Sequence, residues 1–484
     1  MIKMLTTLLL LLSFQGYAQN FVTKDIKSFG ARGDGKTNDH AAFEKAAAFF
    51  NSRGGNGRLV ISRGTYLIGK QDFTQGAEGK PAYLGYDALL LTGVRNLIIE
   101  GKDKARVVYA DSLRFGAFNP QTGQKFSNSK YFTKYAWAAT IGHFINLRDC
   151  REVEIKNLEL DGNLQGTIRG GVYGDKGIQL PHTALFIWNS KKVTVSGINA
   201  HHFALDGISV GNKETNTKDE IKILNSVFEY NGRQGLSWIG GNDLLVKDSK
   251  FNHTGQAGFF SPPGAGVDIE AERGPITNGR FENCEFINNR GVGMVADNGP
   301  SRNCTFKKCT FWGTKTWSIW VNRPAFTFTD CKIYGSFVHG YKAETDADAT
   351  RFIGCHFEDK PYEGKLPYGN FLVESNGRKR VSFRDCSFVS NTKKLVWIQA
   401  SAAWAPEEKY QFDNCRFSIN NDSLPRRDFV AVVRGMRYKN CTFNFTKPEA
   451  KQKKYYLNSC CENYNVDEGG NKVVYADPAN AGKP

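Results

Sequence analysis

The sequence of 484 residues predicts an all-β protein built as a parallel β-helix. Three observations indicate this fold: a phrase of alternating apolar residues that recurs along most of the chain, a second short strand after each copy, and the composition. Fifty glycines suit many turns, and thirty-five phenylalanines suit a long continuous core. Such repeats override chain length, which alone would suggest two or three domains.

Residues 1–18 have the pattern of a secretory signal peptide. Lys3 supplies the positive charge, residues 5–12 the apolar core, and Gly16-Tyr17-Ala18 a cleavage site of small residues. The apolar run is too short to span a bilayer, and no other stretch is long enough. No cysteine follows the signal directly, so a lipoprotein anchor is not expected. We expect a mature chain that begins at Gln19, is secreted or periplasmic and has no membrane contact.

The predicted mature chain is basic. Once Lys3 leaves with the signal, 63 basic and 48 acidic side chains give a formal charge of +15. A basic exported protein is expected to meet an acidic polymer, although a generic basic surface is the alternative. Nucleic acid would require Lys/Arg clusters interleaved with exposed aromatic residues, and the sequence has none. We therefore expect an acidic polysaccharide or oligosaccharide as the substrate, and no nucleic acid. No feature of the sequence indicates an oligomeric state.

Residues 19–70 are predicted to cap the solenoid. The cluster Thr37-Asn38-Asp39 is typical of a helix start, and the following helix should stop near Gly54-Gly55. Strands are expected over 58–62 and 65–68. One face of the helix is apolar and consists of Phe43, Ala46, Ala47 and Phe50.

The run SFGARGDGKTND at residues 28–39, followed by this helix and by Gly64-Thr65-Tyr66, resembles the opening segment of the pectate-lyase superfamily. The resemblance covers about 50 residues and implies a right-handed parallel β-helix, here of about 11 to 12 coils, with the helix capping its open end. The superfamily includes polygalacturonase-type hydrolases, phage tailspikes and alginate epimerases. The resemblance therefore predicts the fold and not the reaction.

Residues 71–464 are predicted to form the body of the solenoid, and 465–484 a polar C-terminal tail. From residue 153 onward the phrase apolar-x-apolar-x-x-small-x-Phe recurs, for example as FENCEF at 281–286. Steps of 22 to 35 residues separate the copies, which is the length of one coil with variable loops. The small residue falls at 226, 249, 284, 309, 331, 355, 386, 415 and 441.

Most of the cysteines occupy this small position, one in each coil. Coils lie about 4.8 Å apart, but parallel stacked side chains are poorly oriented to form disulfides. We therefore expect free thiols that act as small apolar core residues. Zinc is not expected, because no CxxC or Cys/His spacing occurs. The column consists of Cys284, Cys309, Cys331, Cys355, Cys386, Cys415 and Cys441; outside it, Cys150, Cys460 and Cys461 are unexplained.

A second strand is expected after each phrase. The insertions 162–182, 252–265 and 358–370 fall between the phrase and this strand, and 111–142 enters near the same corner. Long loops on one side of a regular scaffold build the walls of a cleft. The predicted second strands are 184–188, 207–210, 235–238, 266–272, 291–297, 316–322, 340–344, 371–374, 395–399 and 429–433.

The central second strand, 266–272, alternates apolar residues with Asp268, Glu270 and Glu272. Asp268 and Glu270 would project from one face about 7 Å apart at Cα, which brackets the carboxyl spacings of retaining and inverting glycosidases. Carboxyls this close push their pKa values apart and so provide a proton donor and a base. A solvated edge with scattered charges is the alternative.

Two further acids are candidate catalytic residues. Asp297 would align with Glu272 on the neighbouring coil, as a second pair or a cation site. Asp206 begins the strand two coils earlier and could reach the same cleft, although an Asp-Gly pair is also typical of a turn.

Seven residues are candidates for substrate binding. Arg273 and Arg290 flank the acids and could bind a carboxylate or sulfate bidentately. Trp320 either stacks on a sugar or packs in the core, whereas Trp238 is expected in the core. The others are His201 and His202 in the turn before Asp206, and Lys342 and Glu344, which would form a subsite about 14 Å along the axis.

The motifs of known relatives do not transfer to this chain. The polygalacturonase pattern that combines Asn-x-Asp, Asp-Asp, Gly-His-Gly and Arg-x-Lys is missing. The epimerase motif Asp-Pro-His is absent from the turn at 204–207, although Leu160-Asp161-Gly162-Asn163 resembles the early coils of that enzyme. The assignment of an active site therefore depends on the acids alone.

Three functions remain open. The first is a secreted glycoside hydrolase with a paired-carboxylate mechanism, which requires no cofactor and uses Asp268 and Glu270. The second is a polysaccharide lyase or C5-epimerase on a uronate polymer, in which the acids would hold Ca²⁺ while a Lys, Arg or His abstracts the C5 proton. The third is a non-catalytic glycan-binding solenoid, which should present a flat aromatic or basic face.

Overall fold

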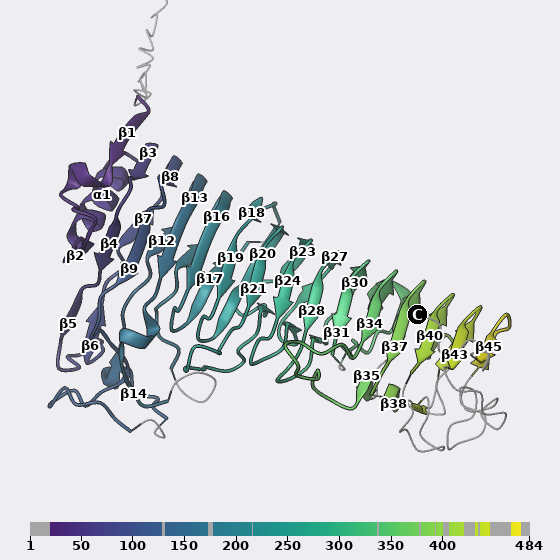
Figure 1. The fold of residues 1–484 in the computed structure, drawn as a ribbon. Helices are drawn as coiled ribbons and strands as arrows, with labels where there is room; N and C mark the ends of the chain where they lie inside the picture. The colour runs from purple at the N-terminus through teal and green to yellow at the C-terminus, as the bar shows by residue number, and fades with distance from the viewer. Residues whose placement is uncertain are drawn as a thin grey trace, which may run out of the picture.

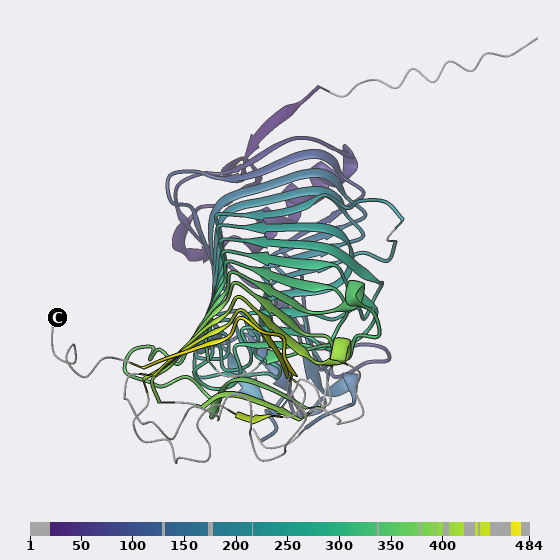
Figure 2. The same cartoon turned by 90° about the vertical axis from the view of Figure 1, so that its right-hand side faces the viewer.

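The computed structural model describes residues 20–127, 131–172, 178–214, 216–335, 338–376, 379–392, 394–399, 406–420, 431–433, 436–445 and 466–475. The chain winds into a right-handed parallel β-helix, so the predicted fold class is confirmed. Figure 1 shows the coils following one another from the capping helix to the C-terminal end, and Figure 2 shows their strands stacked in layers. Each complete coil contributes one strand to each of three parallel sheets.

The first sheet carries the predicted second strands on one side of the solenoid. Its strands pair in parallel, for example Leu236 with Val267 and Val267 with Met294. They are β7 (Leu89–Thr92), β12 (Ile145–Arg148), β15 (Leu185–Trp188), β17 (Asp206–Gly211), the first half of β20 (Gln234–Lys247), β22 (Val267–Ile269), β25 (Met294–Ala296), β29 (Ile319–Val321) and β32 (Val338–His339). Further along, β35 (Phe371–Asn376), β38 (Lys394–Gln399) and β41 (Ala431–Val433) form a separate parallel sheet.

The second sheet contains the first half of each predicted phrase, together with the second half of β20. Its other strands are β1 (Val22–Asp25), β3 (Gly55–Ile61), β8 (Arg95–Gly101), the first halves of β13 (Arg151–Asp161) and β16 (Lys191–His201), β18 (Ile221–Leu224), β23 (Ile276–Glu282), β26 (Ser301–Arg302), β27 (Cys304–Lys307), β30 (Phe326–Thr329), β33 (Arg351–Ile353), β36 (Ser382–Arg384), β39 (Tyr410–Asp413), β42 (Met436–Lys439) and β44 (Val466–Asp467).

The third sheet contains the second half of each phrase, including the second halves of β13 and β16. Its other strands are β2 (Asp34–Asn38), β4 (Thr65–Ile68), β9 (Arg106–Tyr109), β19 (Val227–Glu229), β21 (Lys250–Asn252), β24 (Glu285–Ile287), β28 (Thr310–Trp312), β31 (Lys332–Tyr334), β34 (His356–Glu358), β37 (Ser387–Ser390), β40 (Arg416–Ile419), β43 (Thr442–Phe445) and β45 (Lys472–Tyr475). Within the predicted polar tail, residues 466–475 thus extend the solenoid by two strands.

The core consists of stacked rings, because parallel register places the same position of each coil above the last. Phe281 stacks on Phe306 at 4.5 Å between ring centroids, and Phe306 on Phe328 at 5.1 Å. A second stack contains Phe286 and Phe311, 4.9 Å apart. Such aromatic pairs add about 0.5–1.5 kcal/mol each beyond the burial of their area.

The predicted cysteine column is confirmed. All seven thiols are buried and free, and each lies in the turn between the second and third sheets. The Sγ of Cys309 donates to the carbonyl of Phe281 on the preceding coil at 3.5 Å. Cys150 is a buried free thiol in the turn between the first and second sheets, and it contacts the carbonyl of Leu91 at 3.4 Å. Cys460 and Cys461 lie outside the described residues.

The capping helix α1 (His40–Ser52) covers the N-terminal end of the core, as predicted. Its apolar face is buried, and the ring of Phe43 lies edge-on to Phe144 at 5.5 Å. Asn38, the residue before the N-cap Asp39, accepts a hydrogen bond from the first helical amide, that of His40, at 3.0 Å. Asp39 has a different task, because its carboxylate accepts from the amides of Arg32 and Gly33.

The long insertions leave the solenoid between the third and first sheets. Strands from three of these excursions form a five-stranded sheet: β5 (Gln71–Phe73) and β6 (Tyr83–Gly85) precede β7, β10 (Arg114–Ala117) and β11 (Ala138–Ala139) precede β12, and β14 (Ile168–Gly170) precedes β15. Figure 1 shows β5, β6 and β14 on the same side of the solenoid as β35 and β38. Five 3₁₀ turns complete the described elements: Ile26–Phe29, Tyr135–Trp137, Leu164–Gly166, Asp346–Asp348 and Pro406–Glu408.

Candidate active site

The outer face of the first sheet carries the central acids, but in a different arrangement from the predicted row. Val267 and Ile269 point into the core and Asp268 points outward, as expected from strand alternation. The strand ends at Ile269, and the Glu272 amide donates to the carbonyl of Glu270 at 2.7 Å. The prediction of one straight strand through Glu272 was therefore wrong, because the chain turns after Glu270.

This turn changes the pairing of the acids. Counting on from the pairs Val267–Met294 and Asp268–Val295 places Asp297 beside Glu270 rather than beside Glu272. The predicted alignment of Glu272 with Asp297 is thus corrected by the register. Glu272 instead acts electrostatically on Asp206, two coils away.

A pocket of about 270 Å³ opens on this face around Asp206. Its charged residues come from four different stretches of chain, which only the stacking of coils brings together. The lining consists of Arg148, Gln179, Thr183, Phe186, Trp188, Leu205, Asp206, Ser209, Arg233, Ser237, Ile239, Glu272 and Arg273. Of the predicted site residues, this pocket contains Asp206, Glu272 and Arg273.

Asp206 and Arg233 form a buried pair at the pocket wall. Arg233 Nη1 lies 3.8 Å from Asp206 Oδ1, and the side chains are 5% and 4% exposed. Burial raises the pKa of Asp206 to about 7, and the charge of Glu272 adds to this effect, although Arg233 opposes it. The Asp206 carboxyl can therefore hold a proton close to neutral pH and lose it to a neighbouring group.

Arg233 stays charged in spite of its burial. Burial lowers the pKa of its guanidinium, but the carboxyls of Asp206 and Asp268 outweigh this and raise the pKa above its ordinary value. Among the described residues, neither Arg233 Nε nor Asp206 Oδ1 has a hydrogen-bond partner. Buried polar atoms without partners are costly, so this pair is retained at the expense of stability.

A rigid turn positions Asp206. The amide of Ala204 donates to His182 Nδ1 at 3.1 Å, and the amide of Phe203 donates to Asn231 Oδ1 at 3.0 Å. Complete burial lowers the pKa of His182 to about 3, so this ring is a neutral acceptor. The turn before β17 therefore has fixed partners on both sides, and Asp206 enters the pocket in one orientation.

Asp268 lies beyond the pocket lining and is 1% exposed. Its Oδ2 accepts from the side-chain amide of Gln234. Burial raises the pKa of Asp268 well above its ordinary value, and the charge of Glu270 raises it further; Arg233 opposes this rise, whereas Asp297 and Asp206 add to it. Burial thus favours the protonated form of Asp268, and this residue links the predicted acids into one electrostatic network.

Aromatic side chains form the other wall of the pocket. Phe186 and Trp188 alternate with the core residues Leu185 and Ile187 on β15, so both rings point outward. The two rings are parallel within 19°. A side chain at Gly211 would bring its Cβ within 2.7 Å of the Trp188 ring, so glycine makes room for this indole.

A second cavity of about 460 Å³ adjoins the pocket, and both are lined by Arg148. Asp87 anchors its floor, accepting from the His143 amide and from Asn146 Nδ2 at 2.7 Å each. The ring of His143 stacks on Phe186 at 4.8 Å. The two cavities therefore form a continuous surface along the first sheet toward the capping helix.

The remaining predicted residues lie in several places. Trp320 points outward rather than into the core, beside Val295, and packs against Trp317 at 4.8 Å. Arg290 lies over the ring of Phe260 at 4.1 Å in the loop before β25. Trp238 is buried in the core, as expected.

Three predictions of position need correction. The segment 340–344 contains no strand, because the strand of that coil is β32, which ends at His339. Lys342 and Glu344 therefore lie in a loop, where Glu344 approaches Lys379 at 3.7 Å. His201 ends a strand of the third sheet, and neither it nor His202 lines the pocket around Asp206.

Among the pocket residues that were missed from the sequence, four have charged or large aromatic side chains: Arg148, Phe186, Trp188 and Arg233. Phe186 and Trp188 could have been found from the sequence. Side chains alternate between the two faces of a strand, so a strand with large apolar residues at every position must expose one alternate set on its outer face. Arg148 follows the same rule on β12. Arg233 had no signal, because its burial depends on the neighbouring coils.

A model of the right-handed beta helix region matches residues 143–323. Among solved structures, the A-module of mannuronan C-5 epimerase AlgE4 from Azotobacter vinelandii is 13% identical, with 94% of this chain and 98% of that chain covered and a TM-score of 0.49. The catalytic unit of a GH87 alpha-1,3-glucanase from Streptomyces thermodiastaticus is 14% identical, covering 95% and 68%, with a TM-score of 0.42.

An endo-xylogalacturonan hydrolase from Aspergillus tubingensis is 12% identical over 93% of this chain and 92% of that chain, with a TM-score of 0.36. No curated protein sequence matches the chain. The similarity to these carbohydrate-active enzymes is distant and concerns the fold. Within the described residues, no helix is both long and apolar enough to cross a membrane.

Proposed function

From a chain that folds as a right-handed β-helix, we propose an exported carbohydrate-active enzyme that hydrolyses glycosidic bonds in an acidic polysaccharide or oligosaccharide. Asp206 is the general acid of this reaction. The observation that supports the proposal most is the buried Asp206 carboxyl, whose pKa of about 7 holds a proton at the wall of a pocket lined by aromatic rings and arginines. A general acid works best when its pKa lies near the working pH.

The second carboxylate of the reaction is Glu272. Its side chain is exposed and lines the same pocket as Asp206. Asp206 protonates the departing glycosidic oxygen, while Glu272 either takes a proton from the attacking water or attacks the anomeric carbon itself. Arg233 then stabilises the carboxylate that Asp206 becomes. This assignment replaces Asp268 and Glu270 as the central pair, because buried Asp268 is held by Gln234.

The charges of the pocket support an acidic sugar as the substrate. Arg148, Arg233 and Arg273 all line it, and an arginine can hold a carboxylate or sulfate with two parallel hydrogen bonds. The faces of Phe186 and Trp188 suit the apolar face of a sugar ring. The signal-like residues 1–18 support secretion or a periplasmic location.

The arginines also support a second candidate, a lyase or C5-epimerase on a uronate polymer. In such an enzyme, Arg148 or Arg273 would neutralise the uronate carboxylate during removal of the C5 proton. A calcium ion in this role would need ionised acids, whereas burial favours the protonated forms of Asp206 and Asp268. A third candidate, a glycan-binding module, would present a flat face instead of a pocket.

One experiment separates these candidates. The exported form is incubated with neutral and acidic glycans, with and without chelator, while reducing ends and the absorbance of unsaturated sugars are followed. Reducing ends without new absorbance, lost in Asp206→Asn, support the hydrolase. New absorbance shows a lyase, and a change of C5 configuration without cleavage shows an epimerase; either outcome overturns the proposed hydrolysis.

A matched control is Asp248→Asn. Asp248 is an exposed aspartate in the turn between the second and third sheets, away from the first sheet that carries the pocket. Asparagine tolerates the left-handed backbone of that turn, so the fold should be unaffected. Binding without any chemical change, in both the natural chain and Asp206→Asn, would indicate a glycan-binding module.

A further inference from the structure

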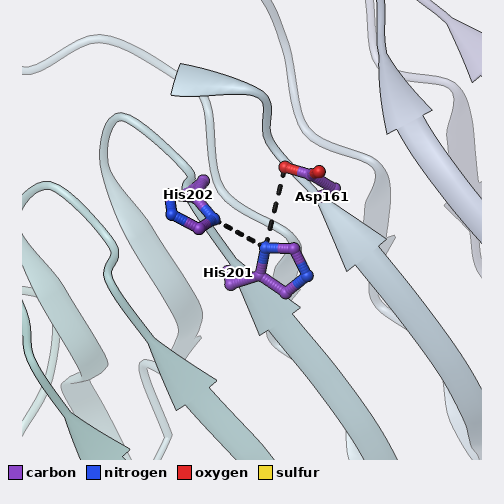
Figure 3. Close-up of side chains that lie close together, drawn as sticks. All are labelled: Asp161, His201 and His202. Carbon is purple, nitrogen blue, oxygen red and sulfur yellow. Dashed lines mark hydrogen bonds and ion pairs between the residues drawn. The ribbon is translucent and has the colours of Figure 1, made fainter. Parts of the chain in front are cut away.

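A second cluster of chemically active side chains lies on the third sheet. Asp161 ends β13, His201 ends β16, and the two residues are direct neighbours in the parallel register. His202 follows with a left-handed backbone, φ 59°, which turns its ring back toward His201 (Figure 3). Two adjacent coils therefore contribute two imidazoles and one carboxylate to the same point.

The distances suit a metal ion. The Nδ1 atoms of His201 and His202 are 2.7 Å apart, and His201 Nδ1 is 3.6 Å from Asp161 Oδ1. One ligand atom from each of the three residues lies within 4.8 Å of the other two. With metal–ligand bonds of about 2.0–2.1 Å, the ligand atoms of a tetrahedral zinc site are about 3.3 Å apart. Small rotations of the side chains would bring all three to that spacing.

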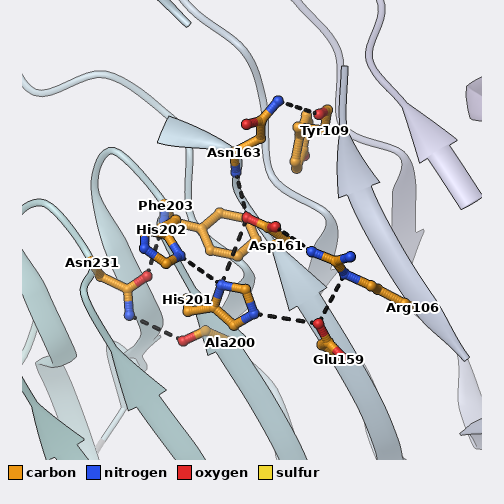
Figure 4. Close-up of polar contacts among 10 residues, drawn as sticks. All are labelled: Arg106, Tyr109, Glu159, Asp161, Asn163, Ala200, His201, His202, Phe203 and Asn231. Carbon is orange, nitrogen blue, oxygen red and sulfur yellow. Dashed lines mark hydrogen bonds and ion pairs between the residues drawn. The ribbon is translucent and has the colours of Figure 1, made fainter. Parts of the chain in front are cut away.

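Neighbouring residues hold the ligands in place, as the outer partners of metal sites do. Arg106 Nη2 binds Asp161 Oδ2 at 2.8 Å, and the Asn163 amide donates to Oδ1 at 2.8 Å, so the carboxylate has one orientation (Figure 4). The His202 ring lies parallel to Tyr230, 5.6 Å away and within 7°. The ligands are therefore ordered before any ion binds.

The charges around the cluster also suit a cation. Asp161 and Glu159 supply two carboxylates, and Arg106 bridges them with a single positive charge. His201 Nε2 faces Glu159 at 3.6 Å, so the ring offers its Nδ1 to the cluster and keeps a carboxylate behind it. A carboxylate behind an imidazole raises its basicity and fixes its tautomer.

We propose that Asp161, His201 and His202 bind one divalent transition metal ion, with Zn²⁺ as the natural ligand and water in the fourth position. Two imidazoles and one carboxylate favour zinc and its neighbours over calcium or magnesium, which prefer oxygen ligands alone. Because the three ligands come from two coils, the ion cross-links them directly before the turn that leads to Asp206. This site is independent of the proposed glycan chemistry.

The test is a titration of the tag-free exported form with Zn²⁺ and Co²⁺ after treatment with chelator. We expect one equivalent of Zn²⁺ to bind in calorimetry and Co²⁺ to show the visible absorption typical of four-coordinate sites. With Cu²⁺ as a further probe, the electron paramagnetic resonance spectrum should show two imidazole nitrogens. His202→Asn and Asp161→Asn should each weaken binding at least tenfold. Asparagine at 202 suits the left-handed backbone, so the former variant is expected to fold.

The matched control is His253→Asn. His253 also has a left-handed backbone, φ 57°, and stacks on the other side of Tyr230 at 4.8 Å, but it is not part of the cluster. It should bind metal like the natural chain. The proposal is overturned if the natural chain binds no metal, or if His202→Asn and His253→Asn bind it equally. Whether the natural chain binds metal does not depend on any variant, so the proposal can be overturned even if a variant fails to fold.

Discussion

Arg233 Nη1 lies 3.8 Å from Asp206 Oδ1, and both side chains are almost completely buried at the wall of a pocket. The pair has an unusual balance. Arg233 remains charged, whereas burial raises the pKa of Asp206 to about 7, so this carboxyl alternates between two states near neutral pH. The charge of Arg233 favours the ionised form of Asp206, whereas burial favours its protonated form. A carboxyl with these two opposing effects is suited to the transfer of one proton.

The first prediction concerns activity. Asp206→Asn removes the proton donor but keeps the shape of the side chain, so kcat should fall by about 10²–10⁴-fold with little change in KM. Asp248→Asn should retain full activity. Equal activity of both variants in initial-rate assays would contradict the assignment of Asp206.

The second prediction concerns the pH dependence of the rate. A general acid must be protonated in the free enzyme, so kcat/KM should decline as pH rises above about 7, the pKa of Asp206. The residual activity of Asp206→Asn should lack this decline. A decline at the same pH in the variant would assign it to another group.

The third prediction concerns stability. The pKa of Asp206 is raised in the folded chain, from 3.8 to about 7, so the folded state binds the proton more tightly than the unfolded state. The stabilisation is complete below about pH 4 and is lost as pH rises toward 7 and beyond. The shift of about three pKa units corresponds to at most about 4 kcal/mol.

Urea denaturation at several pH values measures this effect. Between pH 4 and 8, the unfolding free energy of the natural chain should fall relative to that of Asp206→Asn, which has no proton to lose. A difference between the two proteins that is independent of pH would show that the carboxyl is not protonated in the folded state.

The fourth prediction separates Asp268 from Asp206. Because burial favours the protonated form of Asp268, Asp268→Asn should change the unfolding free energy at pH 7 by less than about 1 kcal/mol. Asp268→Ala leaves the buried Gln234 amide without its acceptor and should cost about 1–3 kcal/mol. A loss of kcat in Asp268→Asn as large as in Asp206→Asn would restore Asp268 as a catalytic residue.

The fifth prediction concerns substrate binding. Trp188→Ala removes the outward ring beside the pocket, so KM should rise about fivefold, equivalent to about 1 kcal/mol, while kcat changes little. The control is Trp312→Ala, whose ring packs on Tyr334 in the third sheet. A matching rise of KM in the control would show that the substrate does not stack on Trp188.

The fold was predictable because its signal is local and repeated. The small residue of each phrase, the phenylalanines around it and the second strand after it define a coil, and coils with the same pattern stack in register. The cysteine column and the inward position of Val267 and Ile269 follow from this repeat. The end of the strand at Ile269 does not, because a turn after Glu270 depends on contacts with Ile239 and Asn298 on other coils.

The position of the site on the solenoid was predictable, but the residues that form it were not. The sequence by itself determined that acids and arginines lie on the loop-rich side of a solenoid, since strand alternation and loop placement are written in the order of residues. Only the tertiary structure decided that burial raises the pKa of Asp206 and that Arg233 is its partner. The physical reason is burial. The groups that desolvate Asp206 and place charges beside it belong to neighbouring coils, such as Arg233 and Glu272. The sequence immediately around Asp206 does not show which residues those are.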